Sequence, residues 1–424
     1  MKFNTLPEWL SWQESLHYKE IDLGLERVQQ VLDHLQLSAD FVCPVISVAG
    51  TNGKGSTVAI LESILLASNY STLCYTSPHL FNYNERIRLN GKPASDQSLC
   101  EVFEHIDQAR ADIALSYFEF GTLAAIVMAA QQAVDVLILE VGLGGRLDAV
   151  NVLNADVALV TTVDIDHTDW LGDDIETIAR EKAGIFRAGK AAFYGGLQPA
   201  QSLINYAAEI QADLKRAAKD YLYQAIGTEH WRLMADVSFQ QLPLPALPGA
   251  YQMQNAALAI MGLMALASIS IDEDALCSGL KNVSLAGRFQ KIQQQPAVYV
   301  DVAHNAQAAQ VLAQLLQESR GEGRTLLVIA MLADKAVHEV IEHLFLQADE
   351  WFSAGLAVPR GLSAKDMAKA LNAAATNGTL CACENVKQAC QQAQQVAGKD
   401  DRIIVLGSFY TVAQAMKFFE QIHV

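Results

Sequence analysis

The segment Val45–Ile60, VISVAGTNGKGSTVAI, carries the strongest chemical signal in the chain. It departs from the phosphate-binding pattern G-x-x-x-x-G-K-[ST], because Val48 replaces the first glycine and Gly55 the hydroxyl residue, with Ser56 one place later. An apolar run precedes the glycines and helix-like apolar spacing follows them. Backbone N–H groups at a helix N-terminus attract anions, and Lys54 adds a mobile cation. We interpret the segment as a nucleotide-phosphate site; an ordinary strand-to-helix turn is the alternative.

Three polar side chains stand where apolar, strand-like runs end. Ser77 follows TLCYT, Glu140 closes VDVLIL, and His167 follows VALVTTVDID. Open α/β sheets bind ligands at the carboxyl ends of their strands, and a carboxylate after an apolar strand can hold Mg²⁺ against phosphates. Each also has a plain alternative: a Ser-Pro turn, an arginine partner for Glu140, or a surface loop for His167. Their convergence beside the phosphate-binding segment favours one nucleotide and metal site.

Lys182, in AREKAGIF, lies on a helix that we expect to begin near Asp174. Spacing alone does not single this lysine out. The ordinary expectation for a helical lysine is a solvated side chain. The residue pattern by itself therefore assigns Lys182 no role.

Strand-like runs alternate with helical patterns from Val45 onward, which predicts a parallel sheet covered on both faces. The runs are VISVAG, TLCYTS, DVLILEVG, DVALVTTV and AAFYGG. Residues 207–248 form a more irregular, strand-bearing insertion, and Ala256–Ala267 is an apolar helix. After a joint at NVSLAGRFQKI the alternation resumes with AVYVDVAHN, TLLVIAML, EWFSAG and RIIVLGS. We expect an α/β protein with a P-loop-type, parallel-sheet nucleotide-binding domain, residues 1–285, and a smaller Rossmann-like α/β domain, residues 286–424.

Length and composition exclude several classes of protein. The 424 residues suit two or three domains at ~100–200 residues each. A net charge of −17 without clustered Lys and Arg argues against a nucleic-acid partner. The longest apolar runs fall short of the ~20 residues of a membrane span, and the N-terminal MKFNTLPEWLSWQESLHY lacks the apolar core of a secretory signal. Seven scattered cysteines fit reduced thiols, so we expect a cytoplasmic protein.

A series of motifs runs along the whole chain: IDLGLERVQQVL, VAGTNGKGST, TSPHLFNYNERIRLNG, YFEFGTLAA, LEVGLGGRLDAVN, DHTDWLGDDIETIAREKAGIF, AGRFQ and DVAHNAQAA. Together they closely resemble the folylpolyglutamate synthase/dihydrofolate synthase family of the Mur ligase superfamily, which contains ATP-dependent amide-forming ligases. The family's phosphate loop reads G-T-N-G-K-G-[ST], so Gly55 is its usual form. One departure is Ala306, where the family usually has proline after AHN.

The resemblance implies a nucleotide site and two Mg²⁺ sites. The implied ATP-binding residues are Thr51, Asn52, Gly53, Lys54, Gly55, Ser56, Asn255, Arg288, Asp301 and His304. Ser77 and Glu140 would bind one Mg²⁺. Glu140, His167 and Lys182 would serve the second and, with Lys54, are the implied catalytic residues. In the family the lysine at the Lys182 position is carbamylated by CO₂, which turns a cation into an anionic ligand.

The resemblance also places a pterin-bearing substrate along three segments. These are Leu23, Gly24, Leu25 and Glu26; Ser116, Tyr117, Phe118 and Glu119; and Leu147, Asp148 and Ala149. Phe118 would offer a stacking ring and Asp148 a hydrogen-bond acceptor. The implied substrates are dihydropteroate, reduced folates and L-glutamate. Family members are commonly monomers, so we expect a monomer.

The implied reaction has two steps. The substrate carboxylate attacks the γ-phosphate of ATP to give an acyl phosphate and ADP, and the amine of glutamate then displaces phosphate. Two narrower hypotheses stay open within this class: a folylpolyglutamate synthase alone, or a ligase acting on a peptidoglycan precursor. Outside it, a P-loop motor or switch and a non-catalytic nucleotide-binding module remain alternatives.

Overall fold

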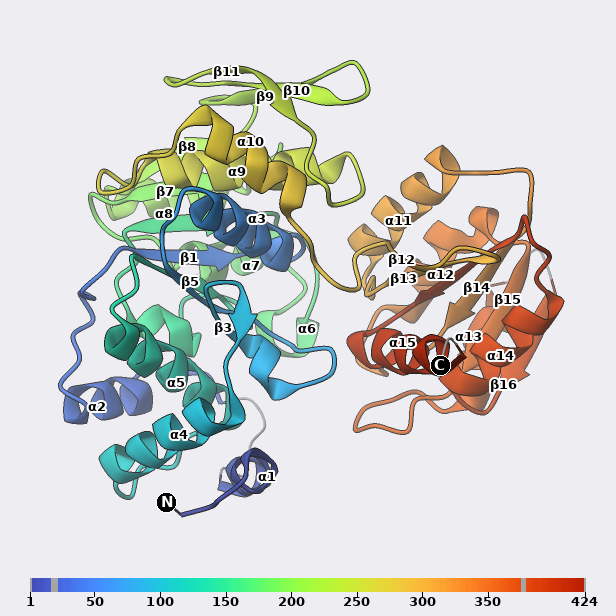
Figure 1. Ribbon diagram of the computed structural model, residues 1–424, viewed down its shortest axis with the longest axis horizontal. Helices are drawn as coiled ribbons and strands as arrows, with labels where there is room; N and C mark the ends of the chain where they lie inside the picture. Colours follow the sequence, from blue (N-terminus) through green and yellow to red (C-terminus); the bar gives the residue numbers. More distant parts are fainter. Residues whose placement is uncertain (1, 17–21, 375–378, 423–424) are drawn as a thin grey trace. The chain divides into compact units, whose positions relative to one another are not determined.

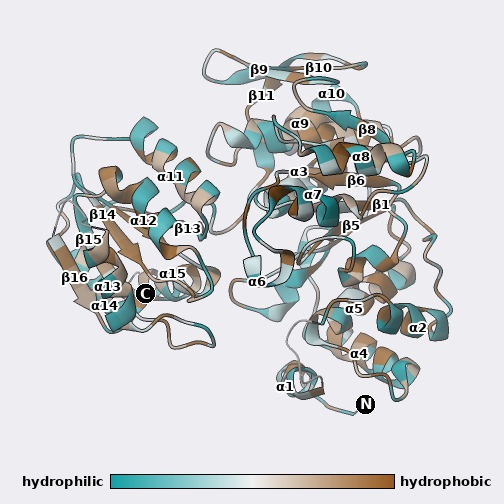
Figure 2. Cartoon of the chain, turned by 180° about the vertical axis from the view of Figure 1, so that it is seen from behind, coloured by the Kyte–Doolittle hydropathy of each residue, from teal (hydrophilic) through white to brown (hydrophobic). Residues whose placement is uncertain are grey.

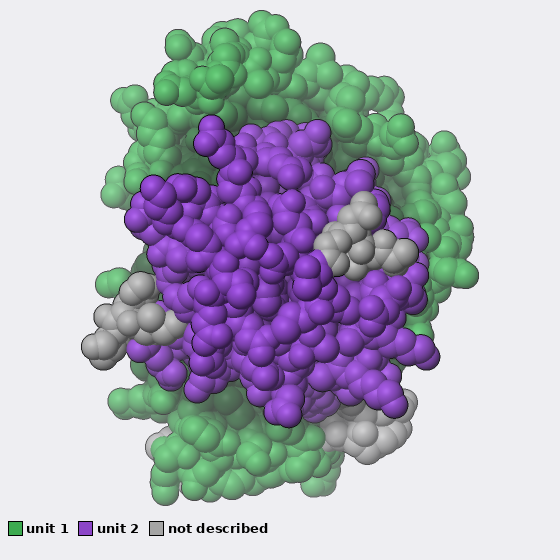
Figure 3. Space-filling model, turned by 90° about the vertical axis from the view of Figure 1, so that its right-hand side faces the viewer, with its two compact units in different colours: residues 1–284 green, residues 285–424 purple. Residues whose placement is uncertain are grey.

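The computed structural model describes residues 2–16, 22–374 and 379–422. The chain divides into two compact units, residues 1–284 and 285–424, which Figure 3 colours separately. The sequence predicts a division after residue 285, and the structure divides after Ser284. Each unit has a sheet and helices of its own.

Unit 1 is built on a mainly parallel sheet. Its described residues form eight strands in the order β4-β3-β2-β5-β1-β6-β7-β8. They are β1 (Val45–Ala49), β2 (Thr72–Tyr75), β3 (Ile87–Leu89), β4 (Lys92–Pro93), β5 (Val136–Glu140), β6 (Val157–Val160), β7 (Ala191–Tyr194) and β8 (Asp213–Arg216). Only the β3 and β4 pairings of this described sheet are antiparallel. The side chains of β1, β2, β5 and β6 are buried throughout, which explains their mainly apolar sequences.

Helices cover both faces of this sheet (Figure 1). They are α1 (Leu6–Leu16), α2 (Glu26–His34), α3 (Lys54–Ala67), α4 (Asp96–Arg110), α5 (Tyr117–Gln132), α6 (Thr168–Leu171), α7 (Ile175–Ala183), α8 (Gln201–Glu209), α9 (Tyr251–Met264) and α10 (Glu273–Asn282), with 3-10 helices η1 (Tyr83–Arg86) and η2 (Ala149–Val152). The connection from β1 through α3 to β2 runs along the sheet in one direction, and the connection from β2 through α5 to β5 runs in the opposite direction. Since such crossovers are right-handed, α3 and α5 lie on opposite faces. α9 and α10 then pack on α3, and α4 on α5.

The predicted insertion is more regular than its sequence indicates. Strands β9 (Leu222–Ile226), β10 (His230–Met234) and β11 (Phe239–Pro243) form a separate antiparallel sheet. Trp231 is fully buried there, and its indole N–H donates to the carbonyl of Pro243 at 2.9 Å. The start of the predicted insertion belongs instead to α8 and to β8, which extends the main sheet.

Unit 2 repeats the alternation of strands and helices. Its described residues form a six-stranded sheet in the order β12-β13-β17-β14-β15-β16. The strands are β12 (Gln290–Gln293), β13 (Ala297–Asp301), β14 (Thr325–Ile329), β15 (Glu350–Ala354), β16 (Thr379–Cys383) and β17 (Arg402–Leu406); the helices are α11 (Ala306–Glu318), α12 (Val337–Leu344), α13 (Ala364–Ala373), α14 (Val386–Val396) and α15 (Phe409–Ile422), with the 3-10 helix η3 (Phe345–Gln347). Figure 2 shows the apolar strands of each unit between more polar helix surfaces. The AGRFQ joint leads directly into the edge strand β12, which sequence analysis does not separate from it.

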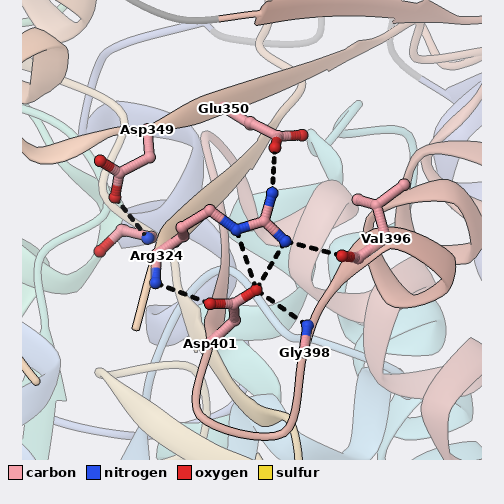
Figure 4. A network of polar contacts seen from close by, with 7 residues as sticks. Arg324, Asp349, Glu350, Val396, Gly398 and Asp401 are labelled. Carbon is pink, nitrogen blue, oxygen red and sulfur yellow. Dashed lines mark hydrogen bonds and ion pairs between the residues drawn. The ribbon is translucent and has the colours of Figure 1, made fainter. Parts of the chain in front are cut away.

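A polar network around Arg324 fastens the amino ends of β14, β15 and β17 (Figure 4). The Arg324 guanidinium donates twice to one carboxylate oxygen of Asp401, at 3.1 and 2.7 Å, and also to Glu350 and to the carbonyl of Val396. The same Asp401 oxygen accepts the N–H of Gly398 at 2.8 Å. The network therefore joins strands that are distant in sequence.

Two chain-wide features bear on the sequence analysis. Among the described residues, no helix combines the length and the apolar character needed to cross a membrane. The seven cysteines all lie in the described segments, and none of them forms a disulfide.

Candidate active site

The phosphate-binding segment is the loop between β1 and α3. The helix begins at Lys54, earlier than its apolar spacing indicates, and Gly53 caps it in the left-handed conformation at φ +90°. Gly55 and Ser56 belong to its first turn. The Lys54 ammonium donates to the carbonyl oxygens of Gly50 at 2.9 Å and Thr51 at 3.2 Å. The loop thus presents a helix N-terminus with a cation folded over it, the arrangement expected of a phosphate site.

The residues after β6 hold this loop in place. The N–H of Thr51 donates to the carbonyl of Thr162 at 2.8 Å, and the Thr161 hydroxyl donates to the carbonyl of Asn52 at 2.6 Å. At Gly50 a methyl group would stand only 1.9 Å from the Thr161 hydroxyl oxygen. Glycine is required here because the two backbones approach so closely.

The amide face of α9 also contacts the loop. Asn255 is buried beside Gly53 and donates to the side-chain oxygen of Gln252 at 2.9 Å. Gln252, also buried, is 3.4 Å from the hydroxyl of Ser56. Sequence analysis identifies Asn255 but misses Gln252. The amides of Gln252 and Asn255, one helical turn apart in YQMQNAALA, could have indicated it.

Ser77 and Glu140 lie together at the same sheet edge. The N–H of Ser77 donates to a carboxylate oxygen of the buried Glu140 at 3.2 Å, and Glu140 pairs in register with Val48. A hydroxyl and a carboxylate suit a hard divalent cation such as Mg²⁺. His167 follows β6, half-buried, at the start of α6. Among the described residues no three His, Cys, Asp or Glu side chains gather as a metal site, so such a cation would need donors of other kinds.

Lys182 is buried, and the expectation of a solvated helix lysine is wrong. Only 4 % of the residue is exposed, and it shares the inward face of α7 with Ile178, Ala179 and Ala183. Burial lowers the pKa of Lys182 to about 7; Lys54 adds to this effect and Asp166 opposes it. Lys182 and the phosphate-loop lysine are therefore close enough to interact electrostatically.

Two glycines, Gly145 and Gly184, explain how Lys182 becomes buried. A methyl group at Gly145 would stand 3.0 Å from the Cα of Lys182, and one at Gly184 would stand 2.4 Å from the Cβ of Arg146. The LGGR segment therefore packs directly against the end of α7, where Lys182 and Ala183 are buried.

The three predicted substrate segments lie side by side. The N–H of Gly24 donates to the carbonyl of Leu147 at 3.2 Å, which joins the first segment to the third. Arg27 forms an ion pair with Glu119 at 2.9 Å, which joins the first to the second. Glu119 also accepts the N–H of Ser116 in a capping box at the start of α5, so its oxygens are engaged within the protein. Leu23, Leu25 and Tyr117 are half-buried, Glu26 is exposed and Ala149 is buried.

Phe118 and Asp148 both lie against the backbone of Gly142. The Phe118 ring lies 2.8 Å from the position of a methyl group at Gly142 and packs on Tyr75 at 5.6 Å. Asp148 is buried and accepts the N–H groups of Leu143 at 2.8 Å and Val150 at 3.1 Å. Burial raises the pKa of Asp148 to about 6, and these hydrogen bonds oppose the rise. An aromatic ring beside a buried carboxyl suits a planar heterocycle with N–H donors.

In unit 2, Arg288, Asp301 and His304 lie near one another. Asp301 ends β13 and accepts the N–H groups of Phe289 and Ala303, both at 2.8 Å. Burial raises the pKa of Asp301 and Arg288 opposes the rise, while the Nδ1 of His304 lies 2.8 Å from the carbonyl oxygen of Val302. Ala306 begins α11, whose cap is Asn305, so the missing proline does not disrupt the turn.

Comparison with known proteins assigns a domain family to each of the two units. The Mur ligase middle domain matches residues 48–263, and the glutamate ligase domain of Mur ligases matches residues 287–409. The dihydrofolate synthase/folylpolyglutamate synthase of Escherichia coli is 42% identical over 98% of this chain and 96% of its own. The structure of E. coli FolC with DHPP and ADP has a TM-score of 0.94 at 41% identity, covering 99% of both chains. A bifunctional folylpolyglutamate synthase/dihydrofolate synthase with Mn, AMPPNP and L-glutamate has a TM-score of 0.90 at 41% identity, covering 99% of this chain and 98% of its own.

A phosphate loop on a parallel sheet, followed by a second α/β unit, defines the two-domain architecture of the Mur ligases. The expected fold class is therefore confirmed. Within that class, the chain belongs to the dihydrofolate synthase/folylpolyglutamate synthase family.

Proposed function

We propose that this protein is an ATP-dependent ligase that joins L-glutamate to dihydropteroate, making dihydrofolate, and to reduced folates, making folylpolyglutamates. The observation that carries the proposal is the position of Lys54. Its ammonium donates to the carbonyl oxygens of Gly50 at 2.9 Å and Thr51 at 3.2 Å, at the N-terminus of α3. A helix N-terminus with a positioned cation suits the phosphates of ATP, in a chain of the dihydrofolate synthase/folylpolyglutamate synthase family.

The proposed nucleotide-binding residues of unit 1 are those of the phosphate loop and Asn255. In unit 2 we propose Arg288, Asp301 and His304 as nucleotide-binding residues. Loop N–H groups and Lys54 bind the phosphates and neutralise charge as the substrate carboxylate attacks the γ-phosphate. That attack forms the acyl phosphate and releases ADP. The amine of glutamate then forms the amide bond and phosphate leaves.

Ser77 and Glu140 are proposed to hold one divalent cation, and Glu140, His167 and Lys182 to serve a second. Bound there, Mg²⁺ supplies positive charge to the phosphate oxygens. We propose that Lys182 is carbamylated: its neutral amine adds CO₂ and releases a proton, which leaves an anionic carbamate. The burial of Lys182 supports this modification, since burial disfavours the ammonium form.

The proposed substrate residues are three segments that lie side by side, residues 23–26, 116–119 and 147–149. The Phe118 ring would stack on the pterin and Asp148 would accept its N–H groups. We further propose a cytoplasmic monomer with no nucleic-acid partner. The free thiols and the net charge of −17 support these assignments.

A substrate comparison tests the proposal. ADP release is measured with dihydropteroate, with tetrahydrofolate and with a muramyl precursor, each with and without L-glutamate. We expect ADP release with both pteridines. Release with tetrahydrofolate alone would favour a folylpolyglutamate synthase, release with the muramyl precursor a peptidoglycan-type ligase, and hydrolysis without any acceptor a motor or switch.

A further inference from the structure

Arg86 is a half-buried cation that no predicted role uses. It ends η1, in the connection between β2 and β3 that also contains Ser77. The Nε of Arg86 donates to the Nδ1 of His79 at 2.9 Å. An Nδ1 that accepts this bond belongs to the neutral ring, with its proton on Nε2. His79 therefore orients the guanidinium without compensating its charge.

The guanidinium borders the proposed pterin pocket. Its central carbon lies 5.4 Å from the ring centroid of Tyr117 and 5.6 Å from that of Tyr83. It also affects the pKa of Tyr75, whose ring packs on Phe118. Contacts with aromatic rings fix the plane of the guanidinium, and the Tyr75 hydroxyl lies within hydrogen-bonding range of it.

The carboxylate of Glu85, next to Arg86 in the sequence, is engaged in other hydrogen bonds. Glu85 accepts three backbone N–H groups, from Leu80 at 2.7 Å, Phe81 at 2.9 Å and Asn82 at 2.7 Å. These bonds fix the loop that carries Arg86, and they leave Glu85 poorly placed to neutralise it. The fold thus holds the Arg86 guanidinium in place, while the neighbouring Glu85 carboxylate is occupied by backbone N–H groups.

Other arginines of the chain differ in this respect. Ion pairs with carboxylates are formed by Arg27, Arg88, Arg110, Arg146, Arg180, Arg216, Arg320, Arg324 and Arg360. Arg187 and Arg402 donate to backbone carbonyls, and Arg232 to the amide of Gln224. In the described part of the chain, only Arg86 and Arg288 have no carboxylate, carbonyl or amide oxygen as acceptor.

We propose that Arg86 binds the non-reacting carboxylate of the terminal glutamate of a folate substrate. This rests on the proposed function. An arginine fork matches a carboxylate, and such pairing relieves the cost of a half-buried, unneutralised cation. The reacting carboxylate has to reach the phosphates near Lys54, and pairing with arginine would reduce its nucleophilicity. Dihydropteroate has only a reacting carboxylate, so Arg86 contributes to one of the two activities and not to the other.

The test compares two substrates in Arg86→Gln and in Arg232→Gln, a control on the separate antiparallel sheet. For Arg86→Gln we expect the KM for tetrahydrofolate to rise about tenfold or more, the equivalent of ~1.4 kcal/mol, and the KM for dihydropteroate to change less than about threefold. Calorimetric titration of tetrahydrofolate without ATP should show the same weakening. Arg86→Lys should recover part of the affinity, because it keeps a point charge. Equal losses for both substrates would overturn the proposal.

A substrate analogue makes the test independent of the variant's folding. A tetrahydrofolate whose terminal glutamate is replaced by γ-aminobutyrate keeps the reacting carboxylate and lacks the other. The wild-type protein should bind it about tenfold more weakly, and Arg86→Gln should bind both forms alike. Equal wild-type affinity for the two forms would also overturn the proposal. Failure of the proposed function would look different, because the wild type would then release no ADP with any pteridine.

Discussion

The side-chain oxygen of Asn255 lies so close to Gly53 that a methyl group on Gly53 would stand 2.6 Å from it. Gly53 also has φ +90°, a conformation that side chains with a Cβ rarely adopt. The first turn of α3 and the amide face of α9 are therefore fitted together at a single glycine. The orientation of the loop N–H groups depends on this contact.

Gly53→Ala should weaken nucleotide binding at least about tenfold, because the loop must move to relieve the clash and ~1–2 kcal/mol of backbone strain. Titration calorimetry with a non-hydrolysable ATP analogue measures the effect. Gly227→Ala is the matched control: it has φ +64° with no atom within 4 Å, and it lies in the β9–β10 turn. Equal nucleotide affinity in the two variants would contradict the proposed loop geometry.

Lys54→Ala should abolish ADP formation while leaving the thermal midpoint within a few degrees of the wild type. The half-buried ammonium donates to two loop carbonyls, so its loss removes charge from the phosphate site without removing core packing. ADP release and a melting curve are measured together, with the exposed Lys92→Ala as control. Near-normal turnover in Lys54→Ala would remove the phosphate-site assignment.

Buried parallel strands could be predicted from the sequence because both of their faces need apolar residues. VISVA and VLILE, in β1 and β5, are examples. β8, with the sequence DLKR, and β16, with TLCAC, were missed because edge strands are partly exposed and carry no such signature. Their strand character comes from pairing with a neighbour, which local sequence does not show.

The positions of Gly53, before the first turn of α3, and of Glu140, at the end of β5, could be predicted because they depend on chain-local geometry. Lys182 was misjudged from its residue type, although Ile178, one helical turn earlier, lies on the same buried face. Arg86 could not be singled out from the sequence, because the neighbouring carboxylate of Glu85 is occupied by three backbone N–H groups only in the folded loop. Hydrogen-bond partners of this kind depend on distances in the folded protein and not on spacing along the sequence.

Asp401→Asn should destabilise unit 2 by about 1–3 kcal/mol at neutral pH, since it weakens charge-assisted bonds to Arg324 and Gly398. Burial alone would raise the pKa of Asp401, but the Arg324 and Gly398 bonds outweigh it and lower the pKa from 3.8. A lowered folded-state pKa gives stability that is present above 3.8 and is lost as the pH falls through the lower, folded value. The difference in melting temperature from the wild type should therefore hold between neutral pH and about pH 5 and shrink in more acidic buffer.

Asp236→Asn is the control for this measurement. The Asp236 side chain is 87% exposed in its ion pair with Lys215, and pairs so exposed contribute little stability. A melting difference for Asp401→Asn that stayed constant into strongly acidic buffer would contradict the role assigned to its ionised form.

Ala306→Pro should be neutral or stabilise the protein by up to about 1 kcal/mol. Ala306 is the first residue of α11, where proline is favoured, and the preceding Asn305 has the extended conformation, φ −136° and ψ 168°, that proline requires before it. Ala308→Pro should instead destabilise the protein, because the N–H of Ala308 donates to the Asn305 cap at 2.9 Å. The melting temperature should fall in Ala308→Pro and stay equal or rise in Ala306→Pro; a loss of stability in Ala306→Pro would show that the turn is strained.

Lys182→Ala should lose most of the ligase activity and melt at or above the wild-type temperature, because it removes a buried, ionisable group. The proposed carbamate predicts more: wild-type activity should fall after CO₂ depletion and return with bicarbonate, and formate or acetate should partly restore the variant by occupying the vacated space. ADP release follows each step, with Lys190→Ala as control, a lysine whose side chain is 49% exposed. Wild-type activity in Lys182→Ala would remove any role for this lysine. If Lys182→Ala lost its activity but the wild-type protein did not respond to CO₂ depletion, the role would belong to the amine of Lys182, since only a carbamate needs CO₂ to form.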